Sequence, residues 1–461
     1  MGKNSEIGKE AVYDARTLGI SKMLVLGLQH MFAMFGATVL VPAITGLEVS
    51  TTLLFAGLGT LLFHLISKRK VPAFLGSSFA YLAAYAAIAP NGEKELLPYA
   101  CLGVFFSGFL YLILAGLIKA FGTTKVMRFF PPIVTGPIII AIGLNLSQSA
   151  VDNCATNYLV AIIAIGIVIG CNIWGKGMVK IIPIILGVIG SYLSAVLISL
   201  LAGAMGFAQV AESFAVDFTP VKEAAWIGLP IYWDRTVFSI FQAPDYNLMI
   251  TAILTIMPVA LATMVEHIGD ISAISSTVGA NYIRDPGLQR TLTGDGLATM
   301  LASLFGAPAN TTYGENTGVL TLTKVFDPAV IRLAAVFAIL FSFCPKFSAL
   351  ISCLPQATMG GVSLVLYGMI SAVGVRNIVE TKINFTESRN VIIAALILVL
   401  SIGINYSSMG AIVIPLGSVT ISLSGLAVGS LVGILMNALL PGKDYTFNEE
   451  KPDATGVNFK V

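Results

Sequence analysis

The chain is dominated by apolar segments that are each long enough to cross a lipid bilayer. A hydrocarbon core of about 30 Å requires roughly 20 apolar residues in a helix. Segments of about this length occupy 22–42, 50–66, 98–119, 132–147, 158–174, 180–203, 248–275, 292–307, 330–352, 358–374, 390–406 and 421–440. Since 56% of the 461 residues are hydrophobic and only 11% are charged, the composition is that of a membrane-embedded protein.

Two further segments, 72–89 and 308–324, have an interrupted apolar pattern. Both contain proline and glycine together with polar residues such as Ser77 and Asn310. Interrupted helices are tolerated in a membrane where they line a cavity, so we expect these segments to be discontinuous spans. Counting them predicts fourteen crossings in an all-α membrane protein.

The positions of lysine and arginine predict the orientation of these crossings, because cytoplasmic loops are enriched in basic residues. With fourteen spans and both termini in the cytoplasm, the outer loops receive only Lys94, Lys222, Arg235 and Lys346. The longest outer segment, 204–246, is expected to be a partly helical loop whose tryptophans lie at the membrane interface.

Several functional classes find no support in the composition or the motifs. A formal net charge of +2 gives no reason to expect a nucleic-acid partner. The five cysteines have neither metal-site nor disulfide-framework spacing, and no phosphate-binding loop or nucleophile–base pair is found. The first 20 residues lack the apolar core of a signal peptide. We therefore expect no metal, no cofactor and no enzyme activity.

Three motifs of the first half recur in the second half, in the same order and at similar spacing. They are Gln29-His30 with Glu266-His267, Pro72-Ala73 with Pro308-Ala309, and the segment 131–136 with the segment 355–360. With seven spans in each half, the second copy enters the membrane from the opposite side, which makes an inverted repeat. Such folds place the substrate near the bilayer midplane, where the ends of broken helices can satisfy a polar ligand.

Few ionisable residues lie within the predicted spans, and each requires a partner or a cavity. Glu266 and Asp270 are four residues apart, so they share one face of the eighth span. We interpret Glu266 as a ligand acceptor or proton carrier rather than a packing residue. Asp270 either shares that role or orients Glu266 or His30 by a hydrogen bond. For His30 and His267, a packing role and a direct role both stay open.

The tenth span carries a third acid, Glu315, directly after Tyr313 and Gly314. Glu315 can cap the half-helix that begins there and still meet a ligand. The glycine permits close backbone approach, and the tyrosine offers a ring face to a planar molecule. This combination suits a flat ligand with alternating N–H and C=O groups, such as uracil.

The segment 310–318, followed by Thr323-Lys324, resembles the nucleobase-ascorbate transporter family and, within it, bacterial uracil permeases. The family signature is Gln, Glu or Pro, then Asn, any residue, Gly, four residues of any kind, Thr and a basic residue or Gly. Here it is Glu315-Asn316-Thr317-Gly318, then four residues, then Thr323-Lys324. The resemblance extends to 29–42, 72–79, 266–267 and 359–367, and so spans nearly the whole chain.

The resemblance implies fourteen spans in two inverted seven-span repeats, with short strands in spans 3 and 10, a core domain and a gate domain. It also implies a multi-pass protein of the cell inner membrane, surrounded by lipid, that dimerises through its gate. The implied boundaries are 1–21 (cytoplasmic segment), 22–120 (core, spans 1–4), 121–203 (gate, spans 5–7), 204–246 (extracytoplasmic loop), 247–353 (core, spans 8–11), 354–440 (gate, spans 12–14) and 441–461 (cytoplasmic tail).

By matching position, the resemblance also implies a substrate site between the two domains. Glu266 and Glu315 would bind ring N–H groups, and the backbone at Phe79 and Gly314 would contact the carbonyl edge. The side chains lining the pocket would be Ala37, Phe79 and Tyr313, with Tyr367 facing them from the gate. The residues that support the site or the coupling to protons would be Asp270, His30, Asn316, Thr323, Ser77 and Tyr367.

An acid at the head of the signature is similar to uracil permeases, whereas xanthine and urate carriers usually have Gln there. The expected function is therefore proton-coupled uracil import by alternating access. Asp270 stands where the uracil permease pattern has a second histidine and resembles xanthine-type carriers, which makes a xanthine or oxopurine symporter the alternative. Sulfate and bicarbonate carriers resemble this architecture too, but two carboxylates at the site argue against an anion exchanger or channel.

Overall fold

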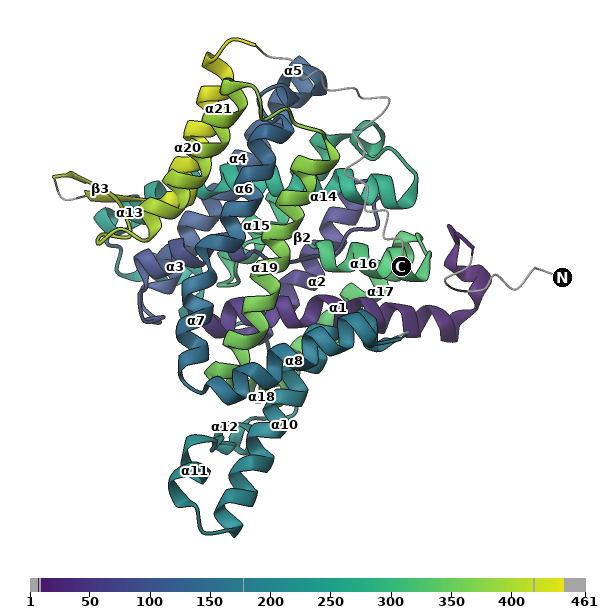
Figure 1. Ribbon diagram of the computed structural model, residues 1–461, viewed down its shortest axis with the longest axis vertical. Coiled ribbons are helices and arrows are strands. Elements are labelled where there is room, and N and C mark those ends of the chain that lie inside the picture. The colour runs from purple at the N-terminus through teal and green to yellow at the C-terminus, as the bar shows by residue number, and fades with distance from the viewer. Residues whose placement is uncertain (1–6, 8–9, 177, 418, 443–461) are drawn as a thin grey trace.

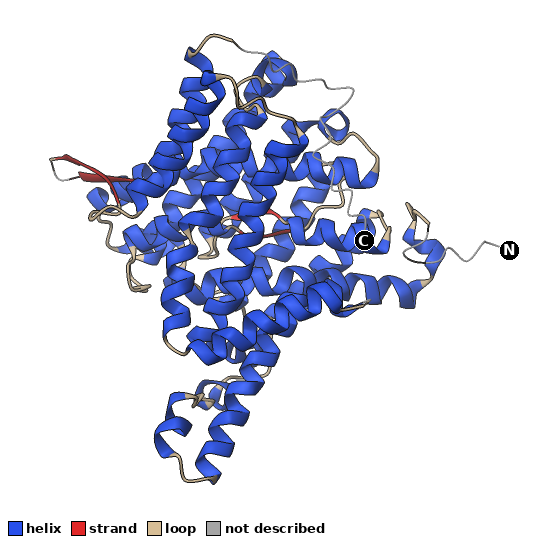
Figure 2. Cartoon of the chain, viewed as in Figure 1, coloured by secondary structure: helices blue, strands red, loops and turns tan. Residues whose placement is uncertain are grey.

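The protein is a bundle of helices with two small pairs of strands (Figure 1). The computed structural model describes residues 7, 10–176, 178–417 and 419–442. The side chain of Glu315 lies outside this description, as does most of the expected tail 441–461. One strand pair lies among the helices at the centre of the molecule, and the other projects from one side (Figure 2).

The α-helices are α1 (Ile20–Thr45), α2 (Val49–Ile66), α3 (Leu82–Ile88), α4 (Leu97–Phe121), α5 (Thr123–Met127), α6 (Pro132–Asn145), α7 (Ser147–Ala155), α8 (Tyr158–Trp174), α9 (Met178–Ile181), α10 (Pro183–Ala204), α11 (Ala208–Ser213), α12 (Thr219–Glu223), α13 (Tyr246–Ile256), α14 (Ala260–Val278), α15 (Leu288–Leu304), α16 (Gly314–Thr323), α17 (Pro328–Ser342), α18 (Pro345–Ser352), α19 (Gln356–Glu380), α20 (Ser388–Asn405) and α21 (Gly425–Leu439). Short turns of other helix types are η1 (Ala15–Leu18), η2 (Phe79–Tyr81), η3 (Trp233–Arg235), η4 (Val237–Gln242), η5 (Met257–Val259) and η6 (Ile283–Gly287). The strands are β1 (Leu75–Ser77), β2 (Asn310–Thr312), β3 (Ala411–Leu416) and β4 (Val419–Ser424).

Most of the predicted apolar segments are helices that could cross a membrane. Within the described ranges, 8 helical segments are long and apolar enough, or up to 9 if the bent pair α17 and α18 counts as one. The 8 are Ile20–Thr45, Val49–Ile66, Leu97–Phe121, Pro132–Ala155, Pro183–Ala204, Tyr246–Val278, Gln356–Glu380 and Ser388–Asn405. Shorter apolar helices cover Phe79–Ile88, Tyr158–Trp174 and Gly425–Leu439.

Two predicted spans differ from the structure in a way that their sequences explain. The segment 330–352 is not one helix, because α17 and α18 meet at an angle of 86°. Pro345 is the first residue of α18, a position that proline favours because it has no N–H to pair. The segment 421–440 begins within strand β4, whose first three residues are β-branched, and becomes helical only at Gly425.

The central strands β1 and β2 form an antiparallel pair, with Leu75 opposite Thr312 and Ser77 opposite Asn310. They occur in the two interrupted segments, where short strands were expected. Neighbouring helices hold the pair by side-chain hydrogen bonds. The Thr60 hydroxyl of α2 accepts from the Leu75 N–H at 2.9 Å, and the Thr299 hydroxyl of α15 donates to the Asn310 carbonyl at 2.9 Å.

Close helix contacts surround this strand pair. Helix α4 packs against α15, and α2 packs against both α15 and α17. Where α4 meets α15, a Cβ added at Gly108 would lie 2.7 Å from the Gly296 carbonyl oxygen, and one at Gly296 would lie 2.8 Å from the Gly108 carbonyl oxygen. Only glycine permits this backbone approach, which is typical of helix pairs in membranes.

The segments outside the long helices also pack in a defined way. Val12 forms a parallel bridge with Val325, and the Ala15 N–H donates to the Asp327 carboxylate at 2.9 Å. The expected loop 204–246 contains the short helices α11 and α12 and the turns η3 and η4.

Candidate functional site

Helix α14 presents two acids toward the central strands. Glu266 and Asp270 are partly exposed, whereas His267 and Ile268, which lie between them, are buried. The Asp270 carboxylate accepts a 2.8 Å hydrogen bond from the Thr312 hydroxyl of β2. The helix also contacts α16. Asp270 is therefore directed at β2, and the helix that carries both acids contacts β2 and α16.

Tyr313 joins β2 to β1 and α1 through its hydroxyl group. That hydroxyl donates to the Ser77 carbonyl at 2.8 Å and accepts from the Thr38 hydroxyl at 3.2 Å. The Ser77 hydroxyl donates in turn to the Thr38 carbonyl at 2.8 Å. A Cβ at Gly76 would lie 2.5 Å from Tyr313 Cζ, so the glycine makes room for the ring. The ring is thereby fixed beside the strand pair.

Helix α16 begins at Gly314, which is exposed. A Cβ added there would meet no other described atom within 4 Å, so there is open space beside this backbone. The first amides of a helix have no intrahelical acceptor and carry partial positive charge. The start of α16 can therefore donate to a carbonyl oxygen. The side chain of Glu315, the next predicted site residue, lies outside the described residues.

His30 and Asn316 connect α1 to α16. The Asn316 side-chain amide donates to the His30 carbonyl at 3.1 Å and lies 3.2 Å from His30 Nδ1. Both side chains are buried. His30 Nε2 and Asn316 Oδ1 have no hydrogen-bond partner in the described structure. Each of these buried atoms can therefore still form a hydrogen bond.

The predicted lining residues come together in one apolar cluster. Ala37, Phe79, Tyr313 and Tyr367 are all buried members of it. The rings of Phe79 and Tyr367 meet edge to face, with centroids 5.5 Å apart. The cluster thus includes residues of α1, of the segment after β1, of the β2–α16 junction and of α19.

Thr323 lies at the other end of α16 from the acids. Its hydroxyl donates to the Val319 carbonyl at 2.9 Å and accepts from the Val325 N–H at 3.3 Å. A ten-residue α-helix is about 14 Å long, which separates Thr323 from Gly314. Its hydrogen bonds fix the end of the helix.

The sequence interpretation missed one buried acid, Asp295 of α15. Asp295 Oδ2 lies 2.7 Å from His267 Nδ1, and both side chains are fully buried. The two atoms are at ion-pair distance without the alignment of a hydrogen bond. The rings of Phe63 and Tyr111 each lie 6.4 Å from the His267 ring. An acid within the predicted span 292–307 was the signal that could have identified this residue.

The arrangement can recognise a planar molecule with N–H and C=O groups. Carboxylates of α14 accept hydrogen bonds, the first amides of α16 donate them, and aromatic rings supply apolar faces. Among the described residues, no group of three or more His, Cys, Asp or Glu side chains could hold a metal ion. Two cavities of the described structure, one beside Trp226 and Lys346 and one beside Tyr13 and Asp285, are lined by other residues.

Comparisons with known proteins show the family to which the chain is similar. The sequence model of a family described as "Permease family" matches residues 21–410. The uracil permease of Bacillus caldolyticus is 38% identical over 457 residues, covering 96% of this chain and 98% of that protein. The uracil permease of Bacillus subtilis (strain 168) is 39% identical over 429 residues, covering 90% and 91%.

A solved structure shares the fold at low sequence identity. The transmembrane domain of the cyanobacterial bicarbonate transporter BicA superimposes with a TM-score of 0.57 at 15% identity. The match covers 93% of this chain and 99% of that domain. The helical arrangement is therefore shared with that domain.

Proposed function

This chain belongs to that permease family, the nucleobase-ascorbate transporters, and on this premise we propose that it is a multi-pass membrane protein that imports uracil together with a proton. The observation that carries the proposal is the similarity to uracil permeases over nearly the full length of both chains. As a transporter, it moves its substrate without changing it chemically.

Uracil would lie between α14, the start of α16 and the rings of Phe79, Tyr313 and Tyr367. Glu266 and Glu315 accept its ring N–H groups, and the backbone at Gly314 and Phe79 contacts its carbonyl edge. Support comes from the exposed start of α16 and the partly exposed face of α14. The Tyr313 ring, which its hydroxyl contacts hold against β1, provides a stacking face for the base.

The span count in this proposal is fourteen, in two inverted halves. The first half would run from α1 to α10, and the second from α13 to α21. The packing of α4 on α15 has its counterpart in α17 on α2, and that of α8 on α10 has its counterpart in α20 on α21. Exchanging the halves converts each of these contacts into the other, as expected for such a repeat.

The proposed motion is alternating access between a core domain and a gate domain. The core would comprise 22–120 and 247–353, and the gate 121–203 and 354–440. Both termini would be cytoplasmic, since that orientation leaves few basic residues in the outer loops. The protein would lie in the cell inner membrane and form a homodimer through its gates.

Proton coupling would depend on Glu266, with Asp270 and His30 as neighbouring polar groups. A carboxyl group that accepts a ligand N–H when ionised can release the ligand when it changes protonation state. Uptake of radiolabelled uracil into vesicles tests the coupling. An imposed inward proton gradient should increase the rate of uracil uptake. An uptake rate that does not change with the gradient would disprove the coupling to protons but not the transport of uracil.

A xanthine or other oxopurine is the second candidate substrate, favoured by an acid at position 270. Competition of labelled uracil uptake by xanthine separates the two, because a uracil carrier should be blocked by excess uracil and not by excess xanthine. An anion substrate fits poorly, since the proposed site carries the acids Glu266 and Glu315. The similarity to a bicarbonate transporter is a similarity of fold and does not indicate a shared substrate.

A further inference from the structure

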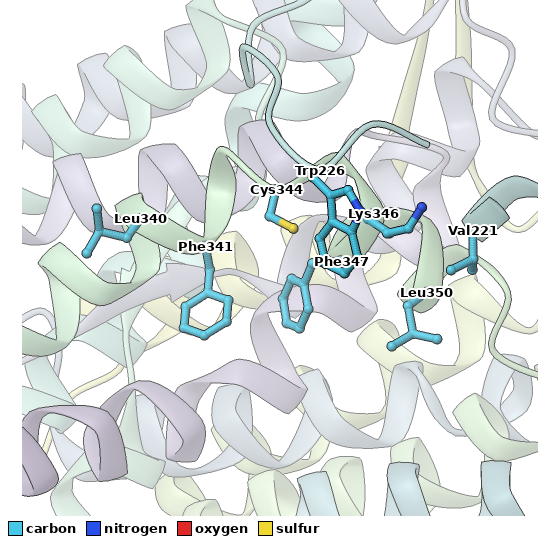
Figure 3. A pocket seen from close by; sticks show the side chains of 8 residues that line it. All are labelled: Val221, Trp226, Leu340, Phe341, Cys344, Lys346, Phe347 and Leu350. Carbon is cyan, nitrogen blue, oxygen red and sulfur yellow. The ribbon is translucent and has the colours of Figure 1, made fainter. Parts of the chain in front are cut away.

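A cavity of about 660 Å³ lies away from the candidate site, where α17 ends and α18 begins. It is lined by Leu340, Phe341, Phe347 and Leu350, and also by Trp226 and Lys346 (Figure 3). The volume falls within the roughly 300–1,000 Å³ that ligand sites occupy. By its volume, this cavity is large enough to bind a small molecule or one segment of a larger one.

The bend between α17 and α18 relates the cavity to the bilayer. If α17 crosses the bilayer, α18 is turned by 86° and lies along the interface, and the cavity then lies at the level of the membrane surface. Phe347, Leu350 and Ile351 follow the i, i+3, i+4 spacing, so they form one apolar face on α18. Trp226, which is 73% exposed, is a residue type enriched at bilayer interfaces.

The lining is apolar except for one cation. Leu340 is 61% exposed on a helix that is apolar enough to lie in lipid. Lys346 Nζ donates to the Ala224 carbonyl at 3.1 Å and lies 5.1 Å from the centre of the Trp226 ring. An ammonium group has three donors, and the carbonyl takes one of them. None of the residues that line the cavity is acidic.

We propose that this cavity binds an anionic glycerophospholipid. One acyl chain lies against Leu340, Phe341 and Phe347, and the phosphate of the headgroup contacts Lys346. The apolar wall opens toward bilayer-facing helices, so it favours an acyl chain that is already in the membrane. The ammonium group of Lys346, beside the interfacial Trp226, favours a headgroup with negative charge.

The position gives this lipid a structural connection to the rest of the protein. Helix α18 joins α17 to α19, which carries Tyr367. The Phe347 ring lies 5.1 Å from the ring of Phe35 on α1 and 5.1 Å from that of Phe341 on α17. The bound lipid therefore contacts the side chains that pack three helices together.

Tryptophan fluorescence tests the proposal, because the chain has only 3 tryptophans. The double variant Trp174→Phe/Trp233→Phe leaves Trp226 as the single reporter. The purified full-length variant is titrated in detergent with acyl-brominated phosphatidylglycerol or acyl-brominated phosphatidylcholine, since bromine quenches tryptophan on contact. We expect quenching that saturates, with half-quenching at an about fivefold lower mole fraction of phosphatidylglycerol, the ratio for roughly one Lys–headgroup contact.

Matched variants separate the site from general contact with lipid. Lys346→Gln should abolish the preference for phosphatidylglycerol, whereas Lys222→Gln, on the neighbouring helix α12, should retain it. A protein whose only tryptophan is Trp174, 76% exposed at the end of α8, reports bulk lipid and should show neither saturation nor headgroup preference. All variants should still bind labelled uracil, which verifies their fold.

Three results would overturn the proposal. Trp226 could respond to both lipids as Trp174 does, which would mean that no site exists. Lys346→Gln could leave the headgroup preference unchanged, which would exclude the phosphate contact. Protection of Trp226 from quenching could increase with protein concentration, which would assign the cavity to a second copy of the chain.

Discussion

His267 of α14 and Asp295 of α15 form a pair in the interior, with Nδ1 and Oδ2 2.7 Å apart and both side chains excluded from solvent. Glu266, the residue before His267, belongs to the proposed uracil site. The pair therefore starts at the residue that follows Glu266 along α14, and it brings α14 and α15 together. When one member of such a buried pair is removed, the other is left in the interior without compensation, which destabilises the fold.

Removal of one member of this pair should destabilise the protein more than removal of both. Asp295→Leu leaves His267 buried without its partner, which lowers the free energy of unfolding by about 3–5 kcal/mol. The double variant His267→Leu/Asp295→Leu should lose less stability than Asp295→Leu alone, because no polar group is then left buried without a partner. Unfolding of the four proteins in detergent measures the difference, and strictly additive losses would show that the two residues do not interact.

The Tyr313 hydroxyl should be required for the shape of the site. Tyr313→Phe removes its bond to the Ser77 carbonyl and its bond from Thr38, so stability should fall by about 1–3 kcal/mol and uracil binding should weaken. Tyr192→Phe is the matched control, because the buried Tyr192 hydroxyl has no hydrogen-bond partner in the described structure. Equal effects of the two substitutions on thermal unfolding and uracil binding would refute the specific role of Tyr313.

Gly314 should matter for the ligand and not for the fold. Gly314→Ala places a methyl group in open space, so thermal stability should stay unchanged or rise slightly. Uracil affinity should fall at least about tenfold, since the methyl group intrudes where the carbonyl edge would approach. Gly368→Ala, at a similarly open and exposed glycine of α19, should change neither quantity. Unaltered uracil binding by Gly314→Ala would move the substrate away from the start of α16.

Much of the helical framework could be predicted from the sequence because apolar length is a local property. The segment 158–174 corresponds to α8 residue for residue, and the segment 50–66 differs from α2 by one residue at its start. The bend before Pro345 was missed, because an apolar run continues across it and only packing decides the angle. The hairpin β3–β4 was missed because the apolar residues of β4 merge with those of α21.

The candidate site was predictable in its residue types and less so in its contacts. The four-residue spacing of Glu266 and Asp270 determines that they share a helix face, and α14 has that face. The partners of Tyr313 and Asp270 could not be derived from spacing, because Thr38, Ser77 and Thr312 come from distant parts of the chain. Asp295 was overlooked although it stands inside a predicted span, where every acid requires an explanation.

The most direct test of the account is equilibrium binding of labelled uracil to the purified protein and to Glu266→Gln. Loss of a hydrogen bond to a charged acceptor should weaken binding about 10- to 100-fold. Glu315→Gln should have an effect of similar size, and Glu212→Gln, on the exposed helix α11, should have none. Wild-type affinity in both Glu266→Gln and Glu315→Gln would contradict the claim that acids of α14 and α16 hold the base.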